Sequence, residues 1–461
     1  MGSSCSWLPD LDQMAGPLYW RIAKALSRDI QSGRLSVGER LPPHRALAEA
    51  LGVTVNTVTK AYAEVERIGL IVSRTGRGTY VKGFPEELAD GSAEKKDVID
   101  LKANVVTGGA FNPVFNKLLG TLSRRGSLHG LLEYHPHPGL ERHRAAGARW
   151  IAQRGIDARA DQVILCNGAQ EGLMAALSAV TRPHDTLLTE KLSYAGLRYI
   201  AEVLRLNIRG IDIDEEGMIP DKLEAACRNE SVAAIFVNPT NHNPTNAFMP
   251  LDRRRALVEI AERAGALVVE DDIFGHVSGY EAPLVTSLAP DRCIYVCGTS
   301  KSIAAGLRVG YVLAPPALVK PIIDALRATY LASPALMAEI TTLLIEDGHA
   351  NEFAAWHRQE SRARQALARE ALGLDTGIAL PSYHLWLSLP EPWRGPDFAT
   401  ELKAKGVLVA PCDQFAVDRS PLPHAVRLAL GAVGGHGRLQ EGLGIIAQTL
   451  TDRSNRLRGN R

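Results

Sequence analysis

The segment SKSIAAGLRVG, residues 300–310, carries the strongest chemical signal in the chain. It places Lys301 seven residues before Arg308 and leads into the apolar run 309–313. A lysine that attacks a carbonyl carbon must first lose its proton, so such lysines lie near other cations and away from water. An arginine can bind a phosphate group through two parallel hydrogen bonds. A Ser-Lys pair alone is common and is usually a solvated surface feature, so the interpretation depends on the rest of the sequence.

Apolar runs on both sides of this segment predict the fold around it. They begin after Ile99, they are short and almost continuously hydrophobic, and helix-like stretches separate them. Buried strands that alternate with helices are typical of a mostly parallel sheet covered on both faces, an α/β fold. The runs are 163–165, 186–188, 233–237, 267–269, 294–296 and 309–313.

Polar motifs follow three of these runs. Residues 166–170 (CNGAQ) lead from a strand into a helix, where free backbone amides bind phosphate. Asp271 comes at a strand end and can pair with the protonated nitrogen of a pyridine ring. Asn243, in the turn 238–245, can hydrogen-bond a ring hydroxyl. Each motif also has an ordinary structural explanation: a glycine that ends a strand, a carboxylate that caps the next segment, or an Asn-Pro turn.

Taken in this order, the four motifs resemble the fold-type-I aminotransferases over roughly residues 99–450. The resemblance implies pyridoxal 5'-phosphate as cofactor, joined to Lys301 as an internal aldimine, with Asp271 on the pyridine nitrogen and Asn243 on the ring oxygen. It implies that the phosphate is held by Gly168, Ala169, Gln170, Ser300 and Arg308. It further implies that Tyr194 stacks on the ring, that Arg427 binds the carboxylate of an amino-acid ligand, and that Tyr134 belongs to the segment lining the dimer-related site.

Three positions depart from the family pattern. Phe274 stands where a tyrosine usually donates to the ring oxygen, Asn246 replaces a glycine, and Gly298 replaces a serine that binds phosphate. The lost tyrosine hydroxyl removes a hydrogen bond that helps to set the pKa of the aldimine. We therefore expect cofactor binding to survive, and efficient turnover to suffer.

A different pattern occupies residues 17–82. Leu18, Ile22, Leu26 and Ile30 recur every four residues and predict an amphipathic helix. A second helix is expected over 44–51, a third after the capping Thr54, and then a hairpin of strands 70–73 and 79–81. Three helices and a hairpin in this order are the plan of a winged helix-turn-helix.

Charge supports a nucleic-acid partner for this segment. Residues 17–82 carry eleven Lys/Arg and five Asp/Glu, whereas the whole chain has a formal net charge of only +1. A basic segment on a neutral body is the electrostatic footprint of a DNA-binding module. A basic helix face alone is more often just solvated.

The segment LPPHRALAEALGVTVNTVTKAYAEVERIGLIVSRTGRGTYV resembles the GntR family of regulators, and the whole chain therefore resembles its MocR subfamily. The GntR family usually has a basic residue after the capping Ser/Thr, and here it is Val55, so one expected phosphate contact is weakened. The resemblance implies double-stranded operator DNA as a partner, contacted through Arg45, Thr54, Asn56, Thr57, Lys60, Arg77 and Gly78.

Composition adds several exclusions. No apolar run is long enough to span a bilayer, and residues 1–12 lack the pattern of a secretory signal. The six scattered cysteines form no Cys-x-x-Cys pair, which fits a reducing cytoplasm and gives no structural metal site. We expect a cytoplasmic protein without a metal ion or membrane attachment.

These observations predict four segments: a disordered tail 1–16, the winged helix-turn-helix 17–82, a linker 83–98 and the aminotransferase-like domain 99–455, which ends in a smaller α+β subdomain. The favoured hypothesis is a regulator, expected to be a homodimer, that senses an amino acid or amine through an external aldimine. The first alternative is a working aminotransferase that carries a DNA-binding head. A regulator with residual transaminase activity lies between the two. The second alternative is a DNA-binding protein whose large domain serves only for dimerisation.

Overall fold

The computed structural model describes residues 7–11, 16–31, 34–35, 39–67, 70–74, 78–81, 98–106, 111–124, 128–135, 137–279, 282–375, 380–418 and 421–458. The chain forms two compact units, Met1–Asp97 and Val98–Arg461. The division of the first unit into tail, head and linker at the predicted positions stays a prediction, since residues 82–97 lie outside the described part.

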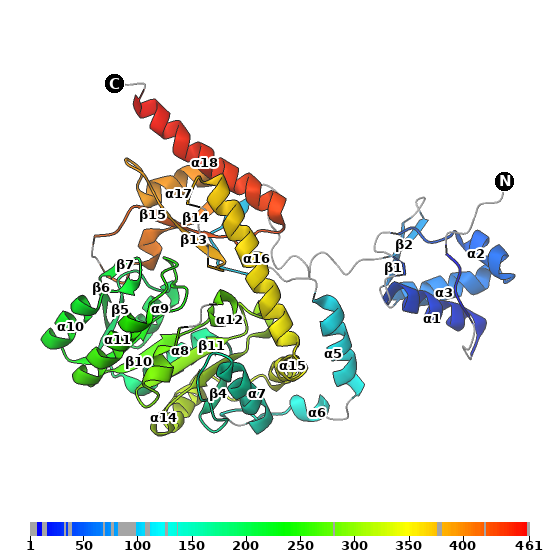
Figure 1. The fold of residues 1–461 in the computed structure, drawn as a ribbon. Coiled ribbons are helices and arrows are strands. Elements are labelled where there is room, and N and C mark those ends of the chain that lie inside the picture. Colours follow the sequence, from blue (N-terminus) through cyan, green and yellow to red (C-terminus); the bar gives the residue numbers. More distant parts are fainter. Residues whose placement is uncertain are drawn as a thin grey trace. The chain divides into compact units, whose positions relative to one another are not determined.

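The first unit is a winged helix (Figure 1). Its elements are α1 (Leu18–Gln31), α2 (His44–Leu51), α3 (Val55–Arg67), β1 (Ile71–Arg74) and β2 (Gly78–Val81). Thr54 caps α3, because its Oγ1 accepts a hydrogen bond from the backbone N–H of Thr57 at 3.2 Å. The predicted apolar stripe of α1 is buried at Ile22 and Leu26, which pack with Val58 and Tyr62 of α3 into a core of their own.

A seven-stranded sheet forms the body of the second unit. All neighbouring strands run parallel except β12, which is antiparallel to both β11 and β4. The expected mostly parallel α/β sheet is confirmed. In spatial order the strands are β4 (Val163–Cys166), β12 (Gly310–Leu313), β11 (Cys293–Gly298), β10 (Leu267–Asp271), β9 (Val232–Val237), β5 (Thr186–Glu190) and β6 (Asn207–Ile211).

Helices cover both faces of this sheet, because successive side chains of a strand point to opposite sides. Val163 and Leu165 face one hydrophobic cluster, whereas Ile164 and Cys166 face another. The helices around the sheet are α7 (Glu141–Ala152), α8 (Ala169–Val180), α9 (Ala195–Val203), α10 (Pro220–Asn229), α11 (Leu251–Ala264), α12 (Gly275–Ser278), α13 (Val285–Leu288), α14 (Pro316–Arg327) and α15 (Ala335–Glu346).

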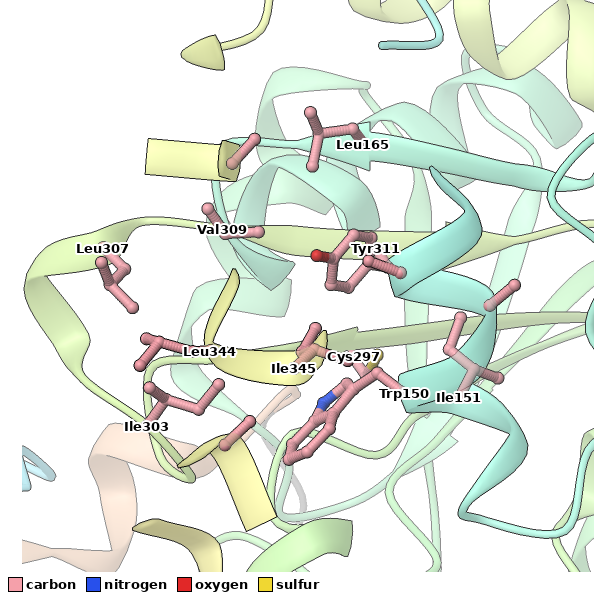
Figure 2. Close-up of a cluster of buried hydrophobic side chains, with 14 of the residues drawn as sticks. Trp150, Ile151, Leu165, Cys297, Ile303, Leu307, Val309, Tyr311, Leu344 and Ile345 are labelled. Atoms are coloured by element: carbon pink, nitrogen blue, oxygen red, sulfur yellow. The ribbon is translucent and has the colours of Figure 1, made fainter. Parts of the chain in front are cut away.

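The first of these clusters fixes α7 and α15 against the sheet. Figure 2 shows Trp150 and Ile151 of α7 and Leu344 of α15 gathered around Tyr311 of β12. A Cβ on Gly147 would lie 2.5 Å from Cδ1 of Tyr311, so glycine lets α7 lie directly on β12. Burying a large apolar side chain such as that of Leu344 stabilises the folded state by roughly 1.5–3 kcal/mol.

A smaller sheet forms the rest of the second unit. Its order is β13 (His384–Ser388), β15 (Ala425–Ala429), β14 (Val407–Pro411) and β3 (Ile99–Leu101), and only the β14/β3 pair is parallel. Since β3 is the first strand of the unit, the chain enters the second unit through the small sheet. The remaining helices are α5 (Asn112–Arg124), α6 (Leu128–Leu131), α16 (His349–Ala371), α17 (Gly395–Ala404) and α18 (His436–Arg458), and β7 (Ile213–Asp214) pairs with β8 (Gly217–Met218).

Candidate functional site

A cavity of about 470 Å³ lies where the large sheet meets residues of the small sheet and its connections. It collects the residues that follow β4, β5, β9, β10 and β11, in agreement with the rule that open α/β sheets bind ligands beyond the carboxyl ends of their strands. Nine predicted site residues line it: Ala169, Gln170, Tyr194, Asn243, Asp271, Ser300, Lys301, Arg308 and Arg427.

One end of the cavity suits an anion. Gly168 begins α8 with a φ of 88° and without a side-chain cap, so the first amides of the helix are left for a ligand. A Cβ on Gly168 would lie 2.8 Å from Nη2 of Arg308, so glycine makes room for the guanidinium. Arg308 donates from Nη1 to Oγ of Ser300 at 3.3 Å. Gly168 does not itself line the cavity; it shapes this anion-binding end, defined as Gly168–Gln170, Ser300 and Arg308.

Lys301 lies in the middle of the cavity and donates from Nζ to the main-chain oxygen of Asn104. Burial, together with the cations Arg427 and Arg308, lowers the pKa of the Lys301 ammonium to about 8, and Asp271 opposes this shift. At pH 7 about a tenth of Lys301 is therefore the nucleophilic free amine, far more than for a lysine with the ordinary pKa.

Asp271 supplies the carboxylate of the cavity. It ends β10, and its Oδ1 accepts a hydrogen bond from the backbone N–H of Ile273 at 3.1 Å. Burial raises the pKa of Asp271 to about 7. A buried carboxyl of this kind is stabilised by a cation placed against it, such as a protonated ring nitrogen.

Arg427 is a buried cation at the other side of the cavity. It donates from Nη1 to Oδ1 of Asn243 at 2.8 Å and from Nη2 to the main-chain oxygen of Lys102 at 2.7 Å. Its guanidinium carbon lies 4.7 Å from the ring centre of Phe415, and its Nε is buried without a hydrogen-bond partner. Burial lowers the pKa of Arg427 to about 10. Both hydrogen bonds of the guanidinium go to uncharged oxygens, so an anionic ligand would neutralise this buried charge.

Tyr194 and Gln170 form one wall. The Tyr194 hydroxyl donates to Oε1 of Gln170 at 2.7 Å, and burial raises the pKa of the Tyr194 phenol. A Cβ on Gly196 would lie within 2.5 Å of both side chains, so this glycine admits the pair.

Several lining residues were not predicted from the sequence. Lys102 and Asn104 follow β3, whereas Gln414 and Phe415 follow β14. No motif marks these positions, because they reach the cavity only through the pairing of β3 with β14 across some 300 residues of chain. Asn238 also lines the cavity, and its position directly after β9 is a sequence feature that could have identified it.

The departures noted in the sequence have visible consequences. The ring of Phe274 is buried, with its centre 5.9 Å from Nζ of Lys301, and offers no hydroxyl. A Cβ on Gly298 would lie 3.1 Å from Cδ1 of Ile273 and 3.3 Å from the main-chain oxygen of Val309, so any larger residue is tightly confined there. Asn246 does not line the main cavity; it borders a second, more open cavity of about 890 Å³ that contains none of the predicted site residues.

Two further residues lie away from the cavity. Tyr134 is 80% exposed and does not line it. Arg198 of α9 does not line it either, and donates from Nη1 to the main-chain oxygen of Ala416 at 3.1 Å.

In the winged helix, the described residues among the predicted DNA contacts lie on α2, on α3 and at its N-cap, and at the start of β2. Arg45, Asn56 and Lys60 are exposed, and Thr54 shares a 2.8 Å hydrogen bond with Thr57. Gly78 opens β2 with a φ of 107°, and a Cβ there would lie 2.9 Å from Nε of Arg40. Arg77 lies outside the described residues, and no other observation tests these contacts.

The fold and the cavity together define a DNA-binding transcription regulator with an aminotransferase-like domain. Residues 96–446 match the family model "Aminotransferase class I and II", and residues 18–81 match "Bacterial regulatory proteins, gntR family". The chain belongs to the aminotransferase class I and II family, with a GntR head in the arrangement of the MocR-type regulators.

Relatives and solved structures agree with this assignment. The chain is 29% identical to the uncharacterized HTH-type transcriptional regulator YdeF of Bacillus subtilis over 97% of both chains. It is 28% identical to the probable rhizopine catabolism regulatory protein MocR of Rhizobium meliloti over 66% of each. The crystal structure of the multiple substrate aminotransferase from Thermococcus profundus covers 82% of this chain and 96% of its own, with a TM-score of 0.71 and 24% identity. The similarity to the aminotransferase structure shows the fold alone.

No helix among the described residues is both long and apolar enough to cross a membrane.

Proposed function

We propose that this regulator senses an amino acid or a related primary amine in the cavity around Lys301, with pyridoxal phosphate as resident cofactor, and that the bound ligand alters operator binding. The observation that carries the proposal is the convergence of Lys301, Asp271 and Arg308, from three separate strand ends, on one cavity. The aminotransferase class I and II fold implies the cofactor.

The lining fits pyridoxal phosphate at both ends. The anion-binding end offers helix amides, a guanidinium and a hydroxyl to a phosphate. Asp271 offers a carboxylate to the ring nitrogen, and Asn243 offers a side-chain amide to the ring oxygen. When bound, the cofactor supplies an aldehyde that reacts reversibly with primary amines. Lys301, with its lowered pKa, holds the free amine needed for covalent attachment.

Arg427 favours a ligand that carries a carboxylate. Its buried guanidinium keeps one nitrogen without a partner while two others are held by Asn243 and the backbone of Lys102. An amino acid whose amine reaches the position of Lys301 can place its carboxylate there. The cavity thus recognises the two charged groups that every amino acid has.

Sensing is favoured over sustained turnover. Transamination would require Lys301 to carry a proton between the ligand and the cofactor, with the cofactor tuned for that transfer. Phe274 provides only an aromatic face close to Lys301, so one hydrogen bond available for tuning is missing.

For the head, we propose that Arg45, Thr54, Asn56, Thr57, Lys60, Arg77 and Gly78 contact operator DNA. We also propose a cytoplasmic homodimer in which Tyr134, exposed in the single chain, faces the partner's cavity. Sedimentation of the purified protein at several concentrations measures the dimer.

One experiment separates the functional alternatives. The purified protein is loaded with pyridoxal phosphate, its visible absorption is recorded while single amino acids are added, and operator binding is measured in the same solutions. A band that shifts and persists, together with changed operator affinity, supports sensing. Steady release of keto acid indicates an aminotransferase. A protein without any visible band, identical to Lys301→Ala, would contradict both.

A further inference from the structure

The side-chain amide of Asn246 lies within hydrogen-bond distance of four groups, three of them in residues 382–386. The two hydrogens of its Nδ2 are shared among three acceptors: Oγ of Ser382 at 2.7 Å, the main-chain oxygen of His384 at 2.8 Å and Oδ1 of Asn241 at 3.2 Å. Its Oδ1 accepts from the backbone N–H of Trp386 at 3.1 Å. The Asn246 amide thus pairs with two backbone groups of β13 as a neighbouring strand would.

This pairing occurs at a place where the sheet itself provides no strand. β13 is the outermost strand of the order β13-β15-β14-β3, so one of its edges faces away from β15. Unpaired backbone groups at a sheet edge need other partners. Asn246 accepts from the N–H of Trp386 and shares the main-chain oxygen of His384 with Nε2 of Gln365, which donates to that oxygen at 2.7 Å. Because Asn246 belongs to the turn that also carries Asn243, it joins the large sheet's connections to the small sheet.

The strand with this edge, β13, pairs with the strand that carries Arg427. Trp386 is the register partner of Arg427 in the β13/β15 ladder. Arg427 in turn donates to Asn243, three residues before Asn246. The turn 243–246 therefore holds these two strands at two points, once through the Arg427 side chain and once through the backbone of β13.

The backbone of Asn246 does not require this side chain. Its φ is 64°, in the left-handed region that glycine adopts most easily and asparagine tolerates. A glycine would keep the turn and lose every hydrogen bond of the side-chain amide, so the two properties of this residue can be separated by substitution.

We propose that Asn246 is a positioning residue, which fixes β13 against the turn 243–246 and thereby holds Arg427 where it meets the carboxylate of an amino-acid ligand. The ligand part of this statement rests on the proposed function, whereas the structural part does not.

The test compares Asn246→Gly with the wild type in the full-length protein loaded with pyridoxal phosphate. The matched control is Arg205→Gly, since Arg205 also has a left-handed φ, 56°, is exposed and follows α9, outside the turn 243–246. Hydrogen exchange of the amides in β13 and β15 gives the first readout. The second is the concentration at half-maximal change of the visible band for L-alanine and for ethylamine, which is L-alanine without its carboxylate.

We expect Asn246→Gly to speed exchange in β13 and β15 about tenfold and to leave β9 unchanged. L-Alanine should bind about tenfold more weakly to Asn246→Gly. The binding of ethylamine to that variant, and of both amines to the Arg205→Gly control, should change by less than about twofold. Equal weakening of both amines would show a merely structural role and overturn the proposal, as would unchanged exchange in β13. If neither amine shifts the band of the wild type, sensing of these amines fails, and exchange alone decides the role of Asn246.

Discussion

Charge is unevenly distributed among the side chains of the cavity. Among the described residues that line it, Lys102, Lys301, Arg308 and Arg427 are cationic, whereas only Asp100 and Asp271 are acidic. A surplus of positive charge in a partly enclosed space favours anions, because the low dielectric strengthens each interaction. A phosphate at Arg308 and a carboxylate at Arg427 would offset this surplus of positive charge.

The pH dependence of cofactor capture follows from Lys301. Covalent attachment needs the free amine, and the pKa of Lys301 lies at about 8 in place of 10.5. The rate of attachment should therefore rise with pH and level off above about 8 to 9. Stopped-flow absorption between pH 6 and 10 measures it, and a midpoint near the ordinary lysine value would contradict the described environment.

Asp271→Asn should separate stability from cofactor binding. Burial raises the pKa of Asp271 to about 7, so in the cofactor-free protein the folded state favours the protonated acid. The contribution of Asp271 to stability then falls as pH rises from its unfolded pKa towards 7, and the charged form costs a few kcal/mol at pH 8.

The isosteric amide removes that cost, and it also removes the partner of the ring nitrogen. We expect Asp271→Asn without cofactor to be more stable than the wild type by about 1–3 kcal/mol at pH 8 and to bind pyridoxal phosphate at least about tenfold more weakly. Urea unfolding and absorption titration measure the two effects. If the stability of Asp271→Asn relative to the wild type does not increase between pH 4 and pH 8, the charge argument is refuted.

At the scale of elements, the sequence predicts most of what the parallel strands determine. The ends of β4, β9, β10 and β11 bear polar motifs, and parallel strands bring such ends to one edge of a sheet. Lys102, Asn104 and Phe415 were missed because they reach the cavity through the small sheet, whose pairing of β3 with β14 is a long-range event without a local signal. The two bonds of Asn246 to β13 were hidden for the same reason.

The helix α3 gives a prediction for DNA binding. Asn56 and Lys60 are exposed on α3, Asn56 near its start and Lys60 one turn further on. Asn56→Ala should cost about 1–3 kcal/mol on the cognate operator and relax specificity, as expected for a base contact. Lys60→Ala should weaken all DNA similarly and reduce the salt slope by about one, as expected for a phosphate contact.

Lys24→Ala provides the matched control for Lys60→Ala. Lys24 is an exposed lysine of α1, and its Nζ lies 4.8 Å from the ring centre of Trp20. The substitution Lys24→Ala removes one positive charge from the winged helix, as Lys60→Ala does, but at a position without a predicted DNA contact. Fluorescence anisotropy at several salt concentrations compares the three variants. An equal salt slope for Lys24→Ala and Lys60→Ala would mean that general charge, and not α3, carries the contact.

The whole molecule joins two units with separate cores, one around α3 and the others around the two sheets. A ligand in the second unit changes DNA binding only if the protein has two conformations that differ in operator affinity and the ligand binds one of them more tightly. The effect of operator DNA on effector affinity is then fixed by the effect of the effector on operator affinity.

Operator DNA should therefore change the affinity for the effector by the same factor by which the effector changes operator affinity, with factors of about 5 to 150 typical of such coupling. Effector titrations by absorption, with and without saturating operator, give one factor, and operator titrations give the other. Unequal factors would exclude simple coupling between the two sites.

The central claim is that Lys301 holds the cofactor covalently within this cavity. The most direct measurement is borohydride reduction of the protein loaded with pyridoxal phosphate, followed by peptide mass spectrometry of wild type and Lys301→Ala. The account predicts a phosphopyridoxyl group on the peptide that contains Lys301, and no modified peptide in the variant at the same cofactor concentration. Modification of another lysine in its place, or an equal yield in Lys301→Ala, would contradict it.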